Sequence, residues 1–159
     1  MRYEHPFYLT LFSNASQALY PNNTIAAFTQ YLPRPIHLNS NEQWEVGLCE
    51  LTCPPPNLGV FVKKNAPVVI GSETAFVYCD LIAPQIVGDS LVRCLRTYTF
   101  PSADCQYRFT NVYYMPLEKH TIQNIRIEVL TQQGKRVGFK SSTTPLKVVL
   151  HFRRVSPYI

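Results

Sequence analysis

The strongest constraint on the fold is an alternation of apolar and polar residues with a period of two. Segment 44–49 reads Trp-Glu-Val-Gly-Leu-Cys, and the same alternation recurs in segments 76–81, 124–129 and 146–153. Successive side chains of a β-strand point to opposite faces of a sheet, so a period of two predicts half-buried strands rather than amphipathic helices. We therefore expect the chain to be built from strands.

Further strands are predicted where Val, Ile, Thr, Tyr and Phe are frequent and the segment ends in turn residues. These segments span residues 6–12, 25–32, 59–63, 67–70, 90–100, 107–114 and 136–140. The 13 prolines confine the backbone to sheet edges and loops, and Pro33-Arg34-Pro35 is expected to separate two strands. About eight to ten short strands without a long helix predict a β-sandwich, jelly roll or barrel. We expect an all-β sandwich.

Length and charge bound the class of protein. A chain of 159 residues is expected to form one domain, 1–159. Only 16% of its residues are charged, against about 25% in ordinary soluble domains. A surface so poor in charge indicates that other chains cover part of it. The net charge of +5 comes from scattered basic residues, so a specific nucleic-acid ligand is not expected. The sequence lacks an apolar run long enough to span a membrane and an apolar leader at its start.

The five cysteines do not form a metal-binding or disulfide pattern. They are Cys49, Cys53, Cys79, Cys94 and Cys105. Their number is odd, and the closest two are separated by three residues, without a histidine nearby. Zinc sites use four nitrogen or sulfur ligands in short paired spacings, which are missing here. We expect free thiols, most of them buried like small apolar side chains.

No catalytic constellation is recognisable either. The sequence has no Gly-x-Ser-x-Gly motif, no glycine-rich phosphate loop, and four isolated histidines. We therefore expect no enzymatic activity, no catalytic or metal-binding residues and no cofactor. His151 alternates with apolar neighbours and is expected on the outer face of its strand. Trp44, Tyr113 and Tyr114 fit either core positions or interface anchors.

Three stretches of the sequence resemble a known family. They are Phe7-Tyr8-Leu9-Thr10-Leu11 with Tyr20-Pro21-Asn22-Asn23-Thr24, Phe28-Thr29, Leu32-Pro33 and Trp44-Glu45-Val46-Gly47-Leu48-Cys49-Glu50-Leu51; then Val77-Tyr78-Cys79-Asp80-Leu81-Ile82-Ala83-Pro84-Gln85-Ile86-Val87-Gly88-Asp89; then Tyr114-Met115-Pro116-Leu117, Ile122, Ile125-Arg126-Ile127, Gly134 and Leu150-His151-Phe152-Arg153. Together they resemble the penton, or minor capsid, proteins of Polinton/Maverick elements, adintoviruses and adomaviruses. These proteins are relatives of the adenovirus penton base.

The resemblance implies a single jelly-roll β-sandwich of about eight antiparallel strands. It also implies a homopentamer that forms the capsomer at each five-fold vertex of a viral capsid. The implied partners are a double-jelly-roll major capsid protein around it and a receptor-binding fibre above it. The expected location is the virion, with assembly inside the host cell, in the nucleus. Many relatives carry a longer insert where this chain has the short, proline-rich passage 53–72, so an outer receptor-binding subdomain is not expected.

A closed ring requires each subunit to present two different surfaces to its neighbours. Edge strands and their connecting loops are expected to supply these surfaces. The candidate interface residues are Pro54, Pro55, Pro56, Asn57 and Leu58 in one loop, Pro84, Gln85, Gly88 and Asp89 in a second, and Gly134, Lys135 and Arg136 in a third. Asp80 and Asp89 are expected to bind backbone amides. Basic residues such as Arg93, Arg96, Arg153 and Arg154 fit either pairing with a neighbour or solvent exposure.

A second hypothesis stays open at this point. The chain is also compatible with a non-viral jelly-roll or β-sandwich binding module, monomeric or trimeric, that binds a glycan or a receptor. The two hypotheses differ in oligomeric state, because only the capsid subunit requires a pentamer.

Overall fold

The computed structural model describes residues 2–54, 74–99, 105–139 and 144–156, and none of these residues is helical. The strands of the described residues are β1 (Phe7–Phe12), β2 (Ala27–His37), β3 (Trp44–Cys53), β4 (Thr74–Cys79), β5 (Gln85–Val87), β6 (Ser90–Val92), β7 (Cys94–Thr99), β8 (Cys105–Arg108), β9 (Tyr114–Pro116), β10 (Thr121–Thr131) and β11 (Lys147–Arg154). The predicted all-β class is confirmed.

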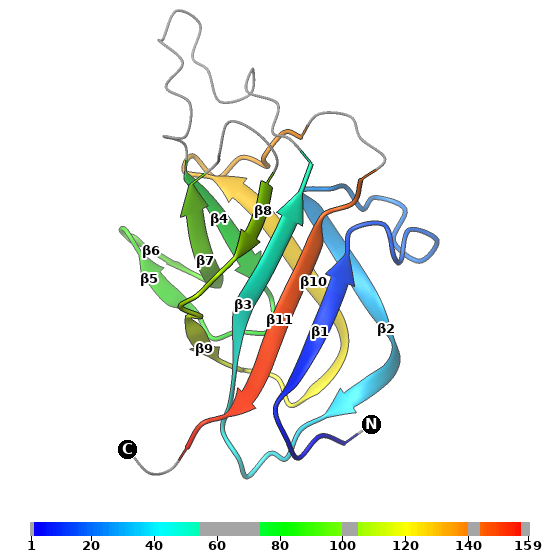
Figure 1. Cartoon of the computed structure of the whole chain (residues 1–159), viewed down its shortest axis with the longest axis vertical. Coiled ribbons are helices and arrows are strands. Elements are labelled where there is room, and N and C mark those ends of the chain that lie inside the picture. Colours follow the sequence, from blue (N-terminus) through cyan, green and yellow to red (C-terminus); the bar gives the residue numbers. More distant parts are fainter. Residues whose placement is uncertain (1, 55–73, 100–104, 140–143, 157–159) are drawn as a thin grey trace, which may run out of the picture.

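Two antiparallel sheets face each other in the molecule (Figure 1). The first has the order β1–β11–β3–β8, with β9 also paired to β3, and the second has the order β2–β10–β4–β7. The strands β1, β2, β3 and β4 alternate between the two sheets along the chain. This alternation produces the jelly-roll sandwich that the sequence resemblance implied. The strands β5 and β6 form a separate two-stranded hairpin.

The core lies between the two sheets and has an aromatic cluster at one end. Phe7 stacks on Phe152 of the neighbouring strand, with ring centroids 4.8 Å apart, and Tyr3 stacks on Phe7 at 3.9 Å. Trp44 is 1% exposed and meets Phe7 at 5.9 Å. Trp44 is therefore a core residue, which settles one of the two roles that its sequence context allowed. Aromatic pairs of this kind stabilise the core by about 0.5–1.5 kcal/mol beyond their buried area.

A β-bulge in β3 shifts the period-two pattern by one residue. Val149 of β11 pairs with Glu50, whereas the next residue, Leu150, pairs with Leu48, so Cys49 has no partner across the strand pair. The carbonyl of Cys49 accepts a hydrogen bond from the N–H of Phe109 instead, at 2.9 Å. Such a bulge leaves an extra residue on one strand and reverses which side chains face the core beyond it.

The segment Pro33-Arg34-Pro35 is the main correction to the predicted elements. It lies inside β2 rather than between two strands. Two features make this possible: β2 is an edge strand, and its register with β10 shifts between Ile122 and Asn124. At the shift, the side-chain amide of Gln123 donates to the carbonyl of Leu32 at 2.8 Å. Proline is tolerated at such places because its missing N–H is not needed by the ladder.

Three other predicted segments are shorter or divided in the structure. Segment 90–100 is split into β6 and β7 at Arg93, and segment 107–114 is split into β8 and β9. Segment 136–140 contributes an isolated bridge between Leu130 and Arg136. The predicted strands 59–63 and 67–70 lie outside the described residues.

The thiols of Cys49, Cys79 and Cys94 form no disulfide, as predicted; Cys79 and Cys94 are buried, and Cys49 is partly exposed. Burial raises the pKa of Cys79 to about 12 and that of Cys94 to about 11, because the thiolate loses its hydration. The same effect, together with the nearby Glu50 carboxylate, raises the pKa of Cys49. The thiols of Cys79 and Cys94 are therefore protonated at neutral pH.

Asp80 ties two strands of the second sheet together directly after β4. Its Oδ1 accepts a hydrogen bond from the backbone N–H of Arg126 at 3.0 Å, as the sequence analysis predicted. Its Oδ2 lies 3.4 Å from Nζ of Lys119. Asp89 was also expected to bind a backbone amide, but its Oδ1 accepts a hydrogen bond from the side-chain hydroxyl of Ser90 instead, at 3.3 Å.

Gly47 allows residues 112–114 to pack closely against β3. It pairs with Tyr114 of β9, and a methyl group at Gly47 would collide with Val112 and lie 2.9 Å from the carbonyl oxygen of Tyr113. Real Cβ atoms do not approach other atoms so closely. The glycine is therefore required by the segment that packs over it.

We predict that Gly47→Ala lowers the free energy of unfolding by about 1–3 kcal/mol, because the added methyl overpacks this contact. Urea unfolding followed by tryptophan fluorescence measures the change through Trp44. The second-site substitution Val112→Ala removes the side chain that the methyl meets, so the double variant is expected to recover part of the loss. An unchanged midpoint in Gly47→Ala would contradict the close contact.

We also predict that Asp80→Ala lowers the free energy of unfolding by about 1–3 kcal/mol, because the Arg126 N–H loses its acceptor. Asp89→Ala is the matched control and is expected to change it by less than about 0.5 kcal/mol, since Asp89 lies on an exposed turn. Both are measured by urea unfolding at low protein concentration. Equal losses in the two variants would contradict the assigned role of Asp80.

Candidate subunit-interface surfaces

Four of the candidate interface residues lie in or beside the hairpin β5–β6. Pro84 and Gln85 are half-buried at its base, whereas Gly88 and Asp89 are exposed at its tip. Gly88 has a φ of 63°, which is the left-handed region that a two-residue hairpin turn requires and glycine adopts without strain. The hairpin projects from one lateral side of the sandwich (Figure 1).

The turn that contains Gly134, Lys135 and Arg136 lies elsewhere, at the end of β10. All three residues are exposed, and Gly134 has a φ of 78°. Thr131 closes this turn: its N–H donates to the carbonyl of Lys135 at 2.7 Å. Pro54 follows β3 and is buried, and Pro55, Pro56, Asn57 and Leu58 lie outside the described residues.

The candidate residues therefore fall on two separate places. The hairpin is a lateral feature, whereas the turn after β10 lies at the end of the sandwich to which β3 also points (Figure 1). The two are not brought together into one surface.

Most of the singled-out arginines are paired within the chain. Arg93 binds Glu118 at 2.9 Å, and Arg153 and Arg154 bind Glu45 and Glu42 at 2.6 and 2.9 Å. Arg96 lies over the ring of Phe109, 3.8 Å from its centroid, and over that of Tyr113 at 4.4 Å. Exposed ion pairs of this kind contribute little to stability, but they leave fewer cations free for a partner.

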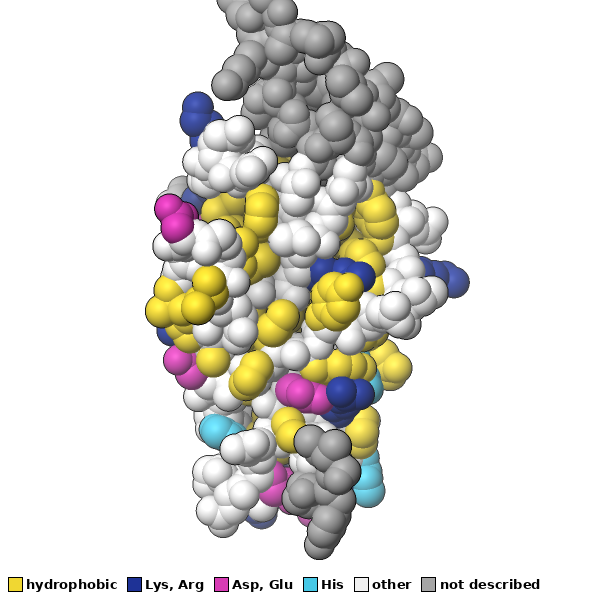
Figure 2. Space-filling view, turned by 90° about the vertical axis from the view of Figure 1, so that its left-hand side faces the viewer, with side chains coloured by type: hydrophobic (Ala, Val, Ile, Leu, Met, Phe, Trp, Pro, Cys, Tyr) yellow, Lys and Arg dark blue, Asp and Glu magenta, His cyan; other side chains and the backbone are white. Residues whose placement is uncertain are grey.

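Sequence reasoning missed most of the exposed apolar side chains; Tyr113, which was named as a possible interface anchor, is the exception and is 56% exposed. The large apolar side chains that are exposed are Tyr8, Phe12, Leu19, Tyr31, Ile86, Leu91, Tyr113 and Val155. Figure 2 looks onto the side with the hairpin and shows apolar side chains gathered over its middle. The one sequence signal was the symmetry of Ile86 and Leu91 about the Gly88-Asp89 turn, which places them opposite each other in a hairpin.

A polar and aromatic cluster covers the outer face of the first sheet. Tyr8 and His151 are neighbours across β1 and β11, with ring centroids 4.5 Å apart. The hydroxyl of Tyr114 forms a hydrogen bond with Nδ1 of His151 at 2.8 Å, and the guanidinium of Arg153 lies 3.4 Å above the Tyr114 ring. His151 thus lies on the outer face, as predicted.

Electrostatics keep this cluster in one protonation state near neutral pH. Partial burial and the nearby Arg153 cation lower the pKa of His151. Burial also raises the pKa of Tyr114, in spite of the opposing effect of Arg153. His151 is therefore neutral and Tyr114 is protonated at pH 7. The cluster makes one connected contact across β1, β11 and β9.

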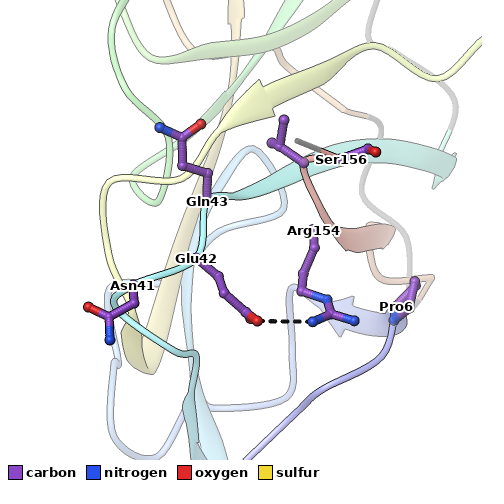
Figure 3. A pocket seen from close by; sticks show the side chains of 7 residues that line it. Pro6, Asn41, Glu42, Gln43, Arg154 and Ser156 are labelled. Atoms are coloured by element: carbon purple, nitrogen blue, oxygen red, sulfur yellow. Dashed lines mark hydrogen bonds and ion pairs between the residues drawn. The ribbon is translucent and has the colours of Figure 1, made fainter. Parts of the chain in front are cut away.

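A cleft of about 800 Å³ lies near the start of β1 and the end of β11, lined by Pro6, Asn41, Glu42, Gln43, Arg154, Val155 and Ser156 (Figure 3). Its charged side chains, Glu42 and Arg154, point toward each other and are paired. The lining residues include no histidine or cysteine. The carboxylate that lines the cleft, that of Glu42, is held by the guanidinium of Arg154 at 2.9 Å.

Two searches of the described ranges gave no site. No three histidine, cysteine, aspartate or glutamate side chains among these residues come close enough to hold a metal ion. The part of the chain that the structure describes also has no helix long and apolar enough to cross a membrane.

Comparison with known proteins supports the fold over almost the whole of the chain. No family model matches the sequence, and no curated protein matches it. Among solved structures, the chain is similar to the crystal structure of the mavirus penton protein, with a TM-score of 0.62. The superposition covers 94% of this chain and 100% of that chain, at 6% sequence identity. The chain thus has the fold of the mavirus penton protein over that protein's whole length.

Proposed function

We propose that this chain is a structural protein of a viral capsid, the penton subunit. The observation that carries the proposal is the superposition on the whole length of the mavirus penton protein. The sequence resemblance to penton proteins supports the same role independently, because it rests on residues rather than on backbone shape.

The assembly that we propose is a homopentamer at the five-fold vertices of an icosahedral shell. The low content of charged residues, 16%, supports a subunit whose surface is partly covered by neighbours. Exposed apolar side chains on both lateral sides of the sandwich support contacts with two neighbouring copies. The hairpin residues Pro84, Gln85, Gly88 and Asp89 and the turn 134–136 stay candidate interface residues in this proposal.

The partners that we propose are other capsid proteins. A double-jelly-roll major capsid protein would surround the pentamer, and a receptor-binding fibre would sit above it. The expected location is the virion. Nuclear assembly, the absence of enzymatic activity and the absence of a specific nucleic-acid ligand stay predictions from the sequence.

We predict that the purified protein has a native mass five times that of the 18.2 kDa chain. Light scattering after size exclusion, at several protein concentrations, measures this mass. Averaged electron micrographs of the same fraction should have five-fold rotational symmetry. A stable trimer, or a monomer at every concentration, would contradict the pentamer and favour the glycan- or receptor-binding module instead.

A further inference from the structure

Four of the exposed apolar side chains, Leu19, Tyr31, Ile86 and Leu91, belong to two opposite lateral sides of the sandwich. One side carries the edge strands β1 and β2, and the other carries β7 and β8. Leu91 and Ile86 belong to the hairpin that leads into β7, whereas Leu19 and Tyr31 belong to the β1–β2 side. The hairpin and this side lie at opposite edges of the molecule (Figure 1). The chain therefore has two distinct apolar surfaces that face away from each other.

The hairpin presents an aliphatic pair to solvent. Ile86 and Leu91 are direct partners across β5 and β6, and they are 80% and 69% exposed. Directly opposed side chains lie on the same face of a strand pair and form one contact surface. A two-stranded hairpin is only marginally stable in water by itself. Two large aliphatic side chains at such a place indicate a surface that another molecule covers.

The β1–β2 side is held in a fixed shape by hydrogen bonds that Ser16 accepts from two backbone N–H groups. The N–H of Tyr31 donates to the hydroxyl of Ser16 at 3.0 Å, and the N–H of Tyr20 donates to the carbonyl of Ser16 at 2.9 Å. These bonds fix the turn that carries Leu19 against β2. Leu19 is 62% exposed and Tyr31 is 45% exposed. An aromatic and an aliphatic side chain thus stand preformed at this edge.

Pro33 and Pro35 limit how a neighbour can contact β2. Both lie within this edge strand, and proline has no N–H to donate to an added strand. A partner therefore contacts this side through side chains rather than by extending the sheet. The exposed pair on the hairpin supplies side chains of the required kind.

The charges on the two surfaces are complementary. Asp89 at the hairpin tip makes no ion pair among the described residues, and its carboxylate is bound by the hydroxyl of Ser90. Arg34, on β2, is exposed and likewise makes no ion pair within the described ranges. Opposite charges on two surfaces favour their association and fix their orientation.

We infer that the hairpin β5–β6 of one copy docks on the β1–β2 side of the next copy. Ile86 and Leu91 pack against the neighbour's Leu19 and Tyr31, and Asp89 approaches the neighbour's Arg34. Each copy contacts one neighbour through its hairpin and the other neighbour through its β1–β2 side. Such a head-to-tail contact can close a ring. The inference rests on the proposed function, since it names the two surfaces that join neighbours in the pentamer.

The test uses two variants that each disable one surface. Ile86→Ser with Leu91→Ser removes the aliphatic pair, and Leu19→Ser with Tyr31→Ser removes the exposed pair on the β1–β2 side. Each variant alone is expected to raise the dissociation constant of the contact by roughly 30-fold or more, the usual effect of removing central interface anchors. Light scattering should then detect monomers where the wild-type chain is a pentamer. All four positions are exposed, and thermal unfolding verifies that each variant folds.

Mixing the two variants distinguishes this contact from a symmetric one. Each variant retains the surface that the other lacks, so one copy of each is expected to join into a dimer that cannot grow. Its mass is twice that of the 18.2 kDa chain. Val155→Ser is the matched control, because it removes an exposed apolar side chain outside both surfaces. It is expected to form the wild-type pentamer.

The charge contact has its own test. Asp89→Arg and Arg34→Asp are each expected to weaken the pentamer, and the double variant, in which both charges are exchanged, is expected to restore it. Additive weakening in the double variant would overturn the pairing of these two residues.

The possible failures are distinguishable. If the wild-type chain is a pentamer and both double-serine variants still form pentamers, the docking of the hairpin is wrong. The docking is also wrong if the two variants do not dimerise on mixing. Either result leaves the penton proposal in place. A wild-type chain that stays monomeric at every concentration would contradict the pentamer itself, and the docking with it.

Discussion

The pairing of the last strand with the first is the constraint on which the rest of the structure depends. The strand β11 lies between β1 and β3, and it is the one strand of the described ranges that pairs with β1 in this sheet. Residues 7–12 are thus held in place by residues 147–152, at the opposite end of the sequence. Contacts so distant in sequence form late and slowly, because a long loop must close first. A chain that lacks β11 therefore loses the partner strand of β1.

The fold was largely predictable because strand periodicity is a local property of the sequence. Alternation located β3, β4, β10 and β11, and the frequency of β-branched and aromatic residues located β1. The prediction was wrong where a longer-range fact decides the outcome. Pro33 and Pro35 do not interrupt β2, because that strand lies at a sheet edge. Segment 107–114 is split opposite the bulge at Cys49, whose carbonyl accepts a hydrogen bond from the N–H of Phe109.

The candidate surfaces were predictable only in part, because exposure is a property of the assembled sheets. The turn at Gly88 and Asp89 is visible in the sequence, but Ile86 and Leu91 look like ordinary strand residues. Only the topology shows that no second sheet covers the hairpin. The cluster of Tyr8, Tyr114 and His151 was hidden for the same reason, since its members come from three distant parts of the chain.

The burial of the thiols has a consequence for the chemical stability of the folded chain. Thiol–disulfide exchange begins with a thiolate, and the raised pKa values of Cys79 and Cys94 leave almost none at neutral pH. Their burial also prevents oxidised glutathione and other disulfides from reaching the two sulfur atoms. The folded chain can therefore pass from reducing to oxidising surroundings without these two thiols forming disulfides by exchange.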